Sequence, residues 1–473
     1  MKTLPLYLDG EFVTTDKTFA VKNPSNGQTI GQMSAINSAL LRKAVTDAHA
    51  AFAGWRALTA KARGDYLVKI ADEVERRREE LARTITLENG KPLAQSAGEV
   101  AMTVDHARWF AGEGRRGYGR TIPHQTDGKR NIVVKTPVGV VAAISPWNFP
   151  LVLSVRKIAP ALAAGCPVIL KTASATPMCN VAFAEICHAV QLPKGVFQLV
   201  AGAASEIARE FLDNPLVRKI TFTGSTEVGR ELISGAASQI KPLSLELGGL
   251  NPVLVFDDAD LEKAVEGTML AKFRNTGQSC IGANRIYVQK GIYERFLQKL
   301  VEKTKALKVG DGFEADVQVG PLIDENALKK ALRHVENAVK NGARLLCGGK
   351  RMDQPGCFIE ATVLADVKEG CLCMREETFA PVAAVSAFES ENDAVALANS
   401  SPFGLSAYLF TRDLSRAFRL METIEAGMIG LNDGLPTTSN APFGGVKQSG
   451  WGRELGSEGL EEFLETKHVS IGL

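Results

Sequence analysis

The stretch Gly139-Val-Val-Ala-Ala-Ile-Ser145 opens a series of short β-branched runs that decides the fold class. Each run is followed by a turn of small residues or proline and then by a stretch with helical spacing. The next runs are Pro167-Val-Ile-Leu-Lys171, Lys219-Ile-Thr-Phe-Thr-Gly224 and Pro252-Val-Leu-Val-Phe-Asp257. Repeated strand–turn–helix order is typical of right-handed βαβ units around a parallel sheet. The sequence therefore predicts an α/β fold.

A second series of strand and helix patterns follows residue 280. It comprises strands at Arg285-Ile-Tyr-Val288 and Pro381-Val-Ala-Ala-Val385, and helices over 293–305 and 325–341. The chain has 473 residues, which is too many for one compact core. We therefore expect a second α/β domain with a parallel sheet.

Two further segments have their own patterns. Apolar residues at helical spacing over 57–87 predict one long amphipathic helix. Polar and apolar residues alternate between Tyr118 and Thr136 around Thr126-Asp-Gly128, which predicts a protruding β-hairpin.

Composition argues against several classes of protein. Lysine and arginine number 55 against 53 aspartates and glutamates, with no basic stripe, so neither nucleic acid nor a membrane is expected as a partner. No apolar run is long enough for a signal peptide or a membrane helix. The eight cysteines form no paired framework, which indicates a reduced, cytoplasmic protein. Cys371 and Cys373 have no further ligands at zinc spacing, so no metal site is expected.

One cysteine lies in a small polar loop, Phe273-Arg-Asn-Thr-Gly-Gln-Ser-Cys280-Ile-Gly-Ala-Asn-Arg285. A thiol reacts as the thiolate, and the cations of Arg274 and Arg285 would favour that form. Cys280 is thus a candidate nucleophile, although a free cysteine also serves as a small core residue.

Three other motifs contain polar groups that are candidates for binding a phosphate, for general-base catalysis or for stabilising an oxyanion. Gly224-Ser-Thr-Glu-Val-Gly229 follows a strand and precedes a helix, so its N–H groups face a pyrophosphate or form an ordinary glycine turn. Glu246 ends an apolar strand before a Gly-Gly turn, and is either a desolvated general base or a solvated strand end. Asn148 lies in a loop stiffened by two prolines, as a preorganised oxyanion donor or as the cap of a rigid turn.

Five motifs, in order along nearly the whole chain, resemble those of the NAD(P)-dependent aldehyde dehydrogenase superfamily. They are Pro146-Trp-Asn-Phe-Pro150, Leu245-Glu-Leu-Gly-Gly249, Gly277-Gln-Ser-Cys280, Glu376-Glu-Thr-Phe-Ala-Pro381 and Pro442-Phe-Gly-Gly-Val-Lys-Gln-Ser-Gly450. The resemblance implies two parallel-sheet α/β domains and a β-hairpin oligomerisation element.

The same resemblance divides the chain. We expect a cofactor-binding domain over 1–117 and 138–248, a catalytic domain over 249–449, and an oligomerisation element over 118–137 and 458–473. The last strand would be available to pair with a neighbouring subunit, and a homodimer or homotetramer is expected.

The resemblance gives four residues roles in catalysis. Cys280 is the nucleophile, Asn148 with the Cys280 N–H forms the oxyanion hole, and Glu246 is the general base that activates water. Thiolate attack on an aldehyde, loss of a hydride and hydrolysis of a thioester follow from these roles. Glu454 matches a second carboxylate that relays protons, with an exposed salt bridge as the alternative.

The resemblance also places residues around a dinucleotide, namely Trp147, Lys171, Gly202, Gly224, Ser225, Glu377 and Phe379. NAD-specific relatives often carry a glutamate three residues after the lysine, where this chain has Ser174. Ser174 leaves room and a hydroxyl for a 2′-phosphate beside the Lys171 cation. We expect NADP to be preferred and NAD to be the weaker cofactor. Ala380 replaces the usual glycine after Phe379, a mild departure in the loop that contacts the ribose.

Within the superfamily the chain is most similar to succinate-semialdehyde dehydrogenases. Arg156 and Arg274 match the clamp for the far carboxylate of the substrate, with pairing to neighbouring acidic residues as the alternative. A hydroxyl of Thr437 or Thr438 would complete the clamp, but their loop differs from the usual one. Glutarate semialdehyde, or an aldehyde with a sulfonate or phosphonate tail, therefore stays open as the substrate.

Two other classes of protein also stay open. A CoA-acylating dehydrogenase would typically lack a carboxylate at Glu246, and a non-catalytic relative would have lost Cys280 or Glu246. Gly282 stands where many relatives have a second cysteine that serves as a redox switch, so no such switch is expected.

Overall fold

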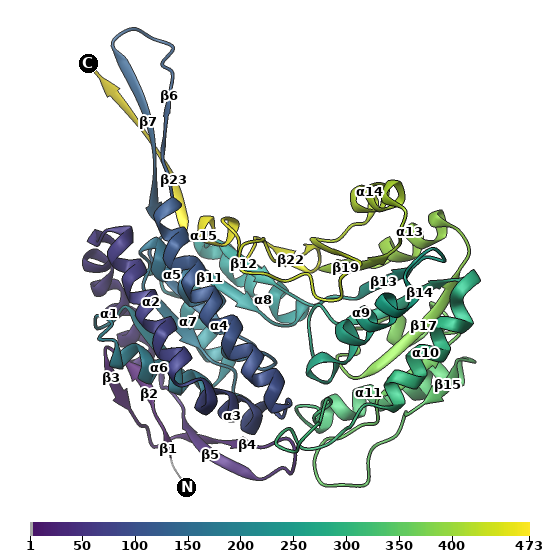
Figure 1. Ribbon diagram of the computed structural model, residues 1–473. Coiled ribbons are helices and arrows are strands. Elements are labelled where there is room, and N and C mark those ends of the chain that lie inside the picture. Colours follow the sequence, from purple (N-terminus) through teal and green to yellow (C-terminus); the bar gives the residue numbers. More distant parts are fainter. Residues whose placement is uncertain (1–2) are drawn as a thin grey trace.

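The run that opens at Gly139 forms the central strand of a mostly parallel sheet in the computed structural model, which describes residues 3–473 (Figure 1). Strand β8 (Val140–Ile144) has β9 (Val168–Lys171) on one side and β11 (Val217–Thr223) on the other. β10 (Phe197–Val200) and β12 (Leu243–Glu246) continue the parallel order outward. The chain therefore builds one half of the sheet before it crosses to the other. The carboxyl ends of β8 and β11 mark the switch point at which doubly wound sheets bind ligands.

Short antiparallel strands complete this first sheet. They are β22 (Gly450–Trp451) beside β12, β2 (Leu6–Leu8) beside β10, and β3 (Glu11–Val13) beside β2. A separate three-stranded sheet is formed by β1 (Thr3–Leu4), β5 (Thr29–Ser34) and β4 (Thr18–Lys22).

The single helix predicted over 57–87 is wrong, because this range takes in the last residue of α1 (Ser38–Ala57), the whole of α2 (Ala60–Arg76) and most of α3 (Arg78–Asn89). The Thr59 side chain caps α2 by accepting a hydrogen bond from Ala62 N at 3.2 Å. Arg77 leaves helical geometry at φ −94° and ψ 18°. Apolar periodicity does not register such breaks, because it continues through both of them.

Five more helices accompany the first sheet. They are α4 (Leu93–Glu113), α5 (Val152–Ala164), α6 (Met178–Ala189), α7 (Ala204–Asp213) and α8 (Thr226–Ala236). α5 is buried along its whole length and packs between α4 and strands β8 and β9. It follows directly on the loop that contains Asn148, so its position also sets the position of that loop.

The second sheet lies beside the first in Figure 1 and has the order β15-β16-β17-β14-β13-β19-β20. All of its strands are parallel except β15. Their bounds are β13 (Asn251–Val255), β14 (Ala283–Gln289), β15 (Arg344–Cys347), β16 (Thr362–Ala365), β17 (Val382–Phe388), β19 (Ser406–Phe410) and β20 (Met428–Leu431). The helices that accompany it are α9 (Leu261–Phe273), α10 (Tyr293–Lys305), α11 (Glu325–Lys340), α12 (Leu372–Arg375), α13 (Glu391–Asn399) and α14 (Leu414–Thr423). The predicted second α/β unit is therefore present.

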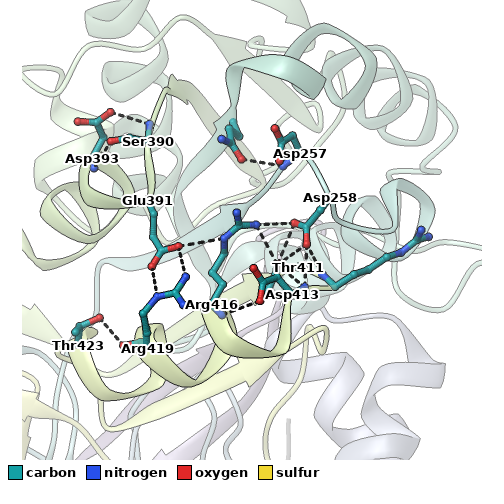
Figure 2. A network of polar contacts seen from close by, with 12 residues as sticks. Asp257, Asp258, Ser390, Glu391, Asp393, Thr411, Asp413, Arg416, Arg419 and Thr423 are labelled. Carbon is teal, nitrogen blue, oxygen red and sulfur yellow. Dashed lines mark hydrogen bonds and ion pairs between the residues drawn. The ribbon is translucent and has the colours of Figure 1, made fainter.

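A polar network holds α13 and α14 at the carboxyl ends of β13 and β19 (Figure 2). Asp258 accepts hydrogen bonds from the Thr411 hydroxyl at 2.9 Å and from Arg416 Nη1 at 2.8 Å. Arg416 also bonds Glu391 at 3.2 Å, and Glu391 in turn accepts from Arg419 at 2.8 Å. This network lies at the end of the sheet opposite to Cys280, so we assign it to structure.

A narrow arm stands away from both sheets in Figure 1. It contains β6 (Arg120–Ile122), β7 (Lys129–Pro137) and β23 (Leu464–Gly472), so the hairpin predicted around Thr126 is present. β23 pairs with β7 of the same chain along its whole length, from Leu464 opposite Pro137 to Gly472 opposite Lys129. The last strand therefore already has a partner along one edge within its own chain.

The remaining elements are short: β18 (Phe403–Gly404) pairs with β21 (Val446–Lys447), and α15 (Glu458–Glu461) precedes the arm. No helix within residues 3–473 has both the length and the apolar character needed to cross a membrane.

Candidate active site

The candidate site lies where the two sheets meet. Strand β12 of the first sheet ends at Glu246 and β13 of the second begins at Asn251. The connection between these two strands is therefore short and consists of residues 247–250. Cys280 lies just before β14, at the same edge as the start of β13. The Asn251 side chain donates to the carbonyls of Cys280 at 2.8 Å and Gly282 at 2.9 Å. The carboxyl edge of one sheet and the amino edge of the other thus form the walls of one site.

The loop before Cys280 has an unusual backbone. Asn275, Thr276 and Gly277 take positive φ angles of 49°, 58° and 73° in succession. This region disfavours a β-branched residue such as Thr276, whose hydroxyl accepts a hydrogen bond from Gly320 N at 2.9 Å. A Cβ on Gly277 would lie 2.3 Å from the Ala380 carbonyl oxygen, so only glycine fits there. Tertiary contacts therefore hold this strained turn.

Cys280 rests as the neutral thiol. Burial raises its pKa to about 12, and the Arg156 guanidinium only partly opposes this effect. The prediction that Arg285 would favour the thiolate is wrong. Arg285 instead donates to the main-chain carbonyls of Leu250 at 3.0 Å and Leu397 at 2.8 Å, which turns its charge away from the loop.

Asn148 faces the nucleophile loop. Its side chain is buried, and its Nδ2 donates to the carbonyl of Gln278, two residues before Cys280, at 3.1 Å. The amide therefore lies against the loop before Cys280, and both residues line the same cavity.

Two buried carboxylates lie behind this loop. The Glu246 Oε2 atom has no hydrogen-bond partner, and its pKa is raised well above the usual value by burial and then by the nearby charge of Glu454. Glu454 is buried rather than exposed and forms an ion pair with Lys157. Lys157 also donates to the Thr223 hydroxyl at 2.6 Å. The site thus holds one carboxylate paired with a cation and one without a partner.

A cavity of about 270 Å³ opens at the switch point between β8 and β11. Seven residues singled out in the sequence line it: Trp147, Asn148, Gly224, Ser225, Cys280, Glu377 and Phe379. The rings of Trp147 and Phe379 meet edge to face with centroids 5.6 Å apart. Ser225 caps α8 by accepting a hydrogen bond from Val228 N at 3.4 Å, so the positive end of this helix faces the cavity.

Glu377 is an unsatisfied buried acid in the wall of this cavity. Its Oε1 atom has no hydrogen-bond partner, and burial raises its pKa to about 7. A ligand with hydroxyl donors would satisfy it, as a ribose does.

Three of the expected cofactor residues lie outside the cavity lining. Lys171 ends β9 and Gly202 follows β10, so both lie farther along the carboxyl edge of the sheet. Lys171 is buried, burial lowers its pKa, and it has no ion pair among residues 3–473. Ser174 is exposed three residues later. A ligand longer than the cavity would reach these residues along the edge.

Arg156 and Arg274 have no acidic partner among the residues that the structure describes. Arg156 is buried on α5, its Nε has no hydrogen-bond partner, and its guanidinium lies 4.5 Å from the centre of the Phe443 ring. The Arg274 guanidinium lies 4.9 Å from the centre of the Phe149 ring. Neither arginine therefore forms the direct pair with an acidic neighbour that was the alternative, although the charges of Glu454 and Glu99 act on them from farther away.

The two candidate threonines differ. The Thr437 hydroxyl is buried and has no partner, so it is available to a ligand. Thr438 is exposed, and its hydroxyl bonds Asn440 Oδ1 at 2.8 Å. Only Thr437 therefore remains a candidate for the clamp.

A sequence model of the aldehyde dehydrogenase family matches residues 12–469. The chain belongs to the aldehyde dehydrogenase family. It is 48% identical to the glutarate-semialdehyde dehydrogenase of Pseudomonas aeruginosa, with 98% of this chain and 97% of that protein covered. The succinate-semialdehyde dehydrogenase (NADP(+)) of Escherichia coli is also 48% identical, with 98% and 97% covered. The 3-sulfolactaldehyde dehydrogenase of Pseudomonas putida is 47% identical, with 98% and 96% covered.

A solved structure gives the same result for the fold of this aldehyde dehydrogenase. The crystal structure of an Escherichia coli NADP-dependent enzyme matches it with a TM-score of 0.98 at 46% identity, covering 100% of this chain and 98% of that one. The predicted α/β fold class and the family are therefore confirmed.

Sequence reasoning missed several groups at the site of this aldehyde dehydrogenase. Lys157 is the clearest case, because a lysine inside a fully buried helix needs a partner, and that alone was a signal. Asn251 connects Cys280 to Ser406: its Nδ2 donates to the Cys280 carbonyl, and its Oδ1 accepts a hydrogen bond from Ser406 N at 2.9 Å. Lys330, on the amphipathic helix α11, also lines the cavity, and no sequence motif indicated it.

Proposed function

We propose that the chain oxidises an aldehyde with an anionic tail, with succinate semialdehyde converted to succinate as the leading case, and that it uses NADP. One observation carries the substrate class: Arg156 and Arg274 lie near Cys280, and neither forms an ion pair with a carboxylate among residues 3–473. Burying a guanidinium is costly unless an anion pairs with it. An aldehyde whose far end is a carboxylate supplies that anion while its carbonyl reaches the Cys280 sulfur.

The first step belongs to Cys280 and Asn148. The sulfur gives up its proton to solvent and forms a bond to the aldehyde carbon, so the C=O π bond breaks and the carbonyl oxygen becomes an alkoxide. The Asn148 amide and the Cys280 N–H donate to this oxygen, which requires Asn148 to exchange its bond to Gln278 for one to the substrate.

The cavity residues fit a dinucleotide. The Trp147 and Phe379 rings would flank its nicotinamide end, Glu377 would accept from a ribose hydroxyl, and the start of α8 would face the pyrophosphate. A nicotinamide bound there supplies the acceptor for the hydride that leaves the former aldehyde carbon. The chain's own part is to hold that carbon on Cys280 beside the cavity.

Glu246 completes the reaction. Hydride loss leaves a thioester on Cys280, and a water molecule must attack its carbon. Glu246 takes a proton from this water, the hydroxide oxygen bonds to the thioester carbon, the C–S bond breaks, and the acid leaves while the sulfur departs as a thiolate that takes up a proton from solvent. The unpartnered Oε2 of Glu246 is free to accept that proton. Glu454, paired with Lys157 beside it, would pass the proton onward.

A glutamate at position 174 is expected to reverse the cofactor preference. In the Ser174→Glu variant a carboxylate would repel the 2′-phosphate of NADP and accept from the 2′-hydroxyl of NAD, next to Lys171. We expect kcat/KM for NADP to fall about 10²-fold while that for NAD changes little or rises. Initial rates with each dinucleotide test this; an unchanged ratio would place the 2′-phosphate elsewhere.

Removing the Arg156 charge is expected to abolish the preference for an anionic tail. For Arg156→Met we expect KM for succinate semialdehyde to rise about 10²-fold, whereas kcat/KM for butanal changes less than about threefold. The melting temperature should stay the same or rise, because the variant removes an unpaired buried charge. Arg412→Met, at an exposed arginine, is the control. A large loss with both aldehydes and a lower melting temperature would make Arg156 structural.

The other anionic aldehydes stay within this proposal. Glutarate semialdehyde is one carbon longer, and a sulfonate or phosphonate tail offers three oxygens to the same two arginines. A CoA-acylating reaction is disfavoured, because Glu246 is placed to activate water. A non-catalytic role is disfavoured, because Cys280, Asn148 and Glu246 converge.

We also propose that the chain forms a homodimer or homotetramer through its arm. The arm is a three-stranded sheet with little buried surface, and β23 is exposed or half-buried along its length. Such a small sheet is only marginally stable unless something covers it. Light scattering would give the number of subunits.

A further inference from the structure

A fully buried ion pair holds the loop that carries Asn148. Lys91 lies between α3 and α4, Glu99 lies on α4, and neither side chain reaches solvent. Their charged atoms are 2.6 Å apart. Both residues are distant from Asn148 in sequence, and neither was singled out by any motif.

Lys91 acts on the main chain of Asn148. Its Nζ donates to the Asn148 carbonyl oxygen at 2.7 Å and lies 3.9 Å from the centre of the Phe149 ring. Asn275, from the strained turn before Cys280, donates to the same carbonyl at 2.8 Å. Because the carbonyl and the side chain of Asn148 share one Cα, these two donors fix the point from which the amide projects.

Asn275 closes a ring of hydrogen bonds between the two halves of the site. Its Nδ2 also donates to the Gln278 carbonyl at 3.0 Å, the carbonyl that the Asn148 amide itself reaches at 3.1 Å. The loop before Cys280 and the Asn148 loop are thus held against each other, and Lys91 adds a cation to these hydrogen bonds.

Glu99 anchors the other end of the same loop. Its Oε1 accepts from Leu151 N at 2.9 Å and Val152 N at 3.2 Å, the first N–H groups of α5. Its Oε2 holds Lys91. One carboxylate therefore connects the start of α5 to the cation that holds the Asn148 carbonyl.

We propose that Lys91 and Glu99 are positioning residues that set the oxyanion donor Asn148 for catalysis. This inference rests on the proposed role of Asn148. A shift of the donor by about 1 Å is enough to lose about 10²-fold in rate, and a buried charge pair resists such a shift because any movement separates charges in a medium of low dielectric.

A double-mutant cycle tests whether Lys91 acts through Asn148. We expect Lys91→Met to lower kcat about 30-fold to 100-fold, with little change in the dissociation constant of NADP measured by tryptophan fluorescence. Asn148→Ala alone should lower kcat about 10²-fold to 10³-fold. In the Asn148→Ala background, Lys91→Met should cost less than about threefold, because the group that it positions is gone.

Matched variants separate positioning from folding. Glu88 is a second buried carboxylate that caps a helix, accepting from Met178 N at 2.6 Å and Cys179 N at 2.9 Å at the start of α6. Glu99→Gln and Glu88→Gln each keep an amide oxygen as an acceptor for their helix, but Glu99→Gln also leaves the buried Lys91 charge without its partner, so its melting temperature should fall further than that of Glu88→Gln. Only Glu99→Gln should lower kcat. Lys91→Met combined with Glu99→Gln leaves no uncompensated buried charge and keeps the test valid if Lys91→Met alone does not fold.

The outcomes are distinct. Equal costs of Lys91→Met with and without the Asn148 side chain would overturn the positioning role and leave the proposed function standing. Equal losses of kcat in Glu88→Gln and Glu99→Gln would also overturn it. An Asn148→Ala protein with undiminished kcat would instead remove the oxyanion role on which both proposals rest.

Discussion

Replacing Cys280 with serine is expected to lower kcat by about 10⁴-fold or more, because both proposed covalent intermediates form on the Cys280 sulfur. The melting temperature should change little, since the substitution is small and Cys280 keeps contact with the cavity. Cys347→Ser and Cys357→Ser are the controls, as both are free, half-buried cysteines away from the site. We expect them to keep activity within about twofold.

The resting state of the thiol gives this prediction a pH dependence. Burial raises the pKa of Cys280 to about 12, so the reactive thiolate is the minor form at neutral pH and increases as pH rises. The rate of alkylation by a neutral reagent should therefore increase about tenfold per pH unit between pH 7 and 9 in the protein without dinucleotide. A plateau near pH 7 would show instead that Arg156 and Arg274 outweigh burial.

Replacing Glu246 with glutamine is expected to separate the two halves of the reaction. Water attack on the thioester should slow by about 10²-fold to 10⁴-fold, because the general base is lost. The earlier steps use Cys280 and Asn148, so one equivalent of NADPH per site should still form in a rapid burst. Rapid mixing measures the burst, and mass spectrometry of the quenched protein should find the acyl group on Cys280.

The pH dependence of turnover should also identify Glu246. Burial and the nearby Glu454 charge raise its pKa well above the usual value, so the basic form appears only above that raised pKa, and hydrolysis should increase with pH through it. Glu246→Gln should remove this dependence. Glu88→Gln is the control and should keep the pH dependence, because burial raises the pKa of Glu88 to about 7 as well, yet Glu88 lies on α3 and bonds the start of α6. Loss of the burst in Glu246→Gln would mean that Glu246 acts before the thioester forms.

The sequence predicts the fold well where one local pattern suffices. β-branched runs marked β8, β9, β11 and β13, and the helix predicted over 293–305 has those bounds. The pattern failed over 57–87, because the breaks depend on a cap at Thr59 and on the backbone of Arg77 rather than on apolar spacing.

At the candidate site too, local motifs predict which residues take part but not how their side chains are oriented. Motifs located Cys280, Asn148 and Glu246, but the orientation of a side chain depends on groups far away in sequence. Arg274 and Arg285 flank the nucleophile almost symmetrically in the sequence. Yet the Arg274 guanidinium lies over the Phe149 ring, while Arg285 donates to carbonyls at the end of α13. The Lys157–Glu454 pair joins residues nearly 300 positions apart, which no local pattern encodes.

In the proposed function, the unpaired Arg156 and Arg274 select an aldehyde with an anionic tail. The most direct measurement is the initial rate of NADPH formation with succinate semialdehyde, beside butanal of equal length and a sulfonate-tailed aldehyde. The account predicts that kcat/KM for an anionic aldehyde exceeds that for butanal by about 10²-fold or more. A higher value for the sulfonate than for succinate semialdehyde would keep the clamp and change the substrate. Equal values for butanal and both anions would contradict the claim.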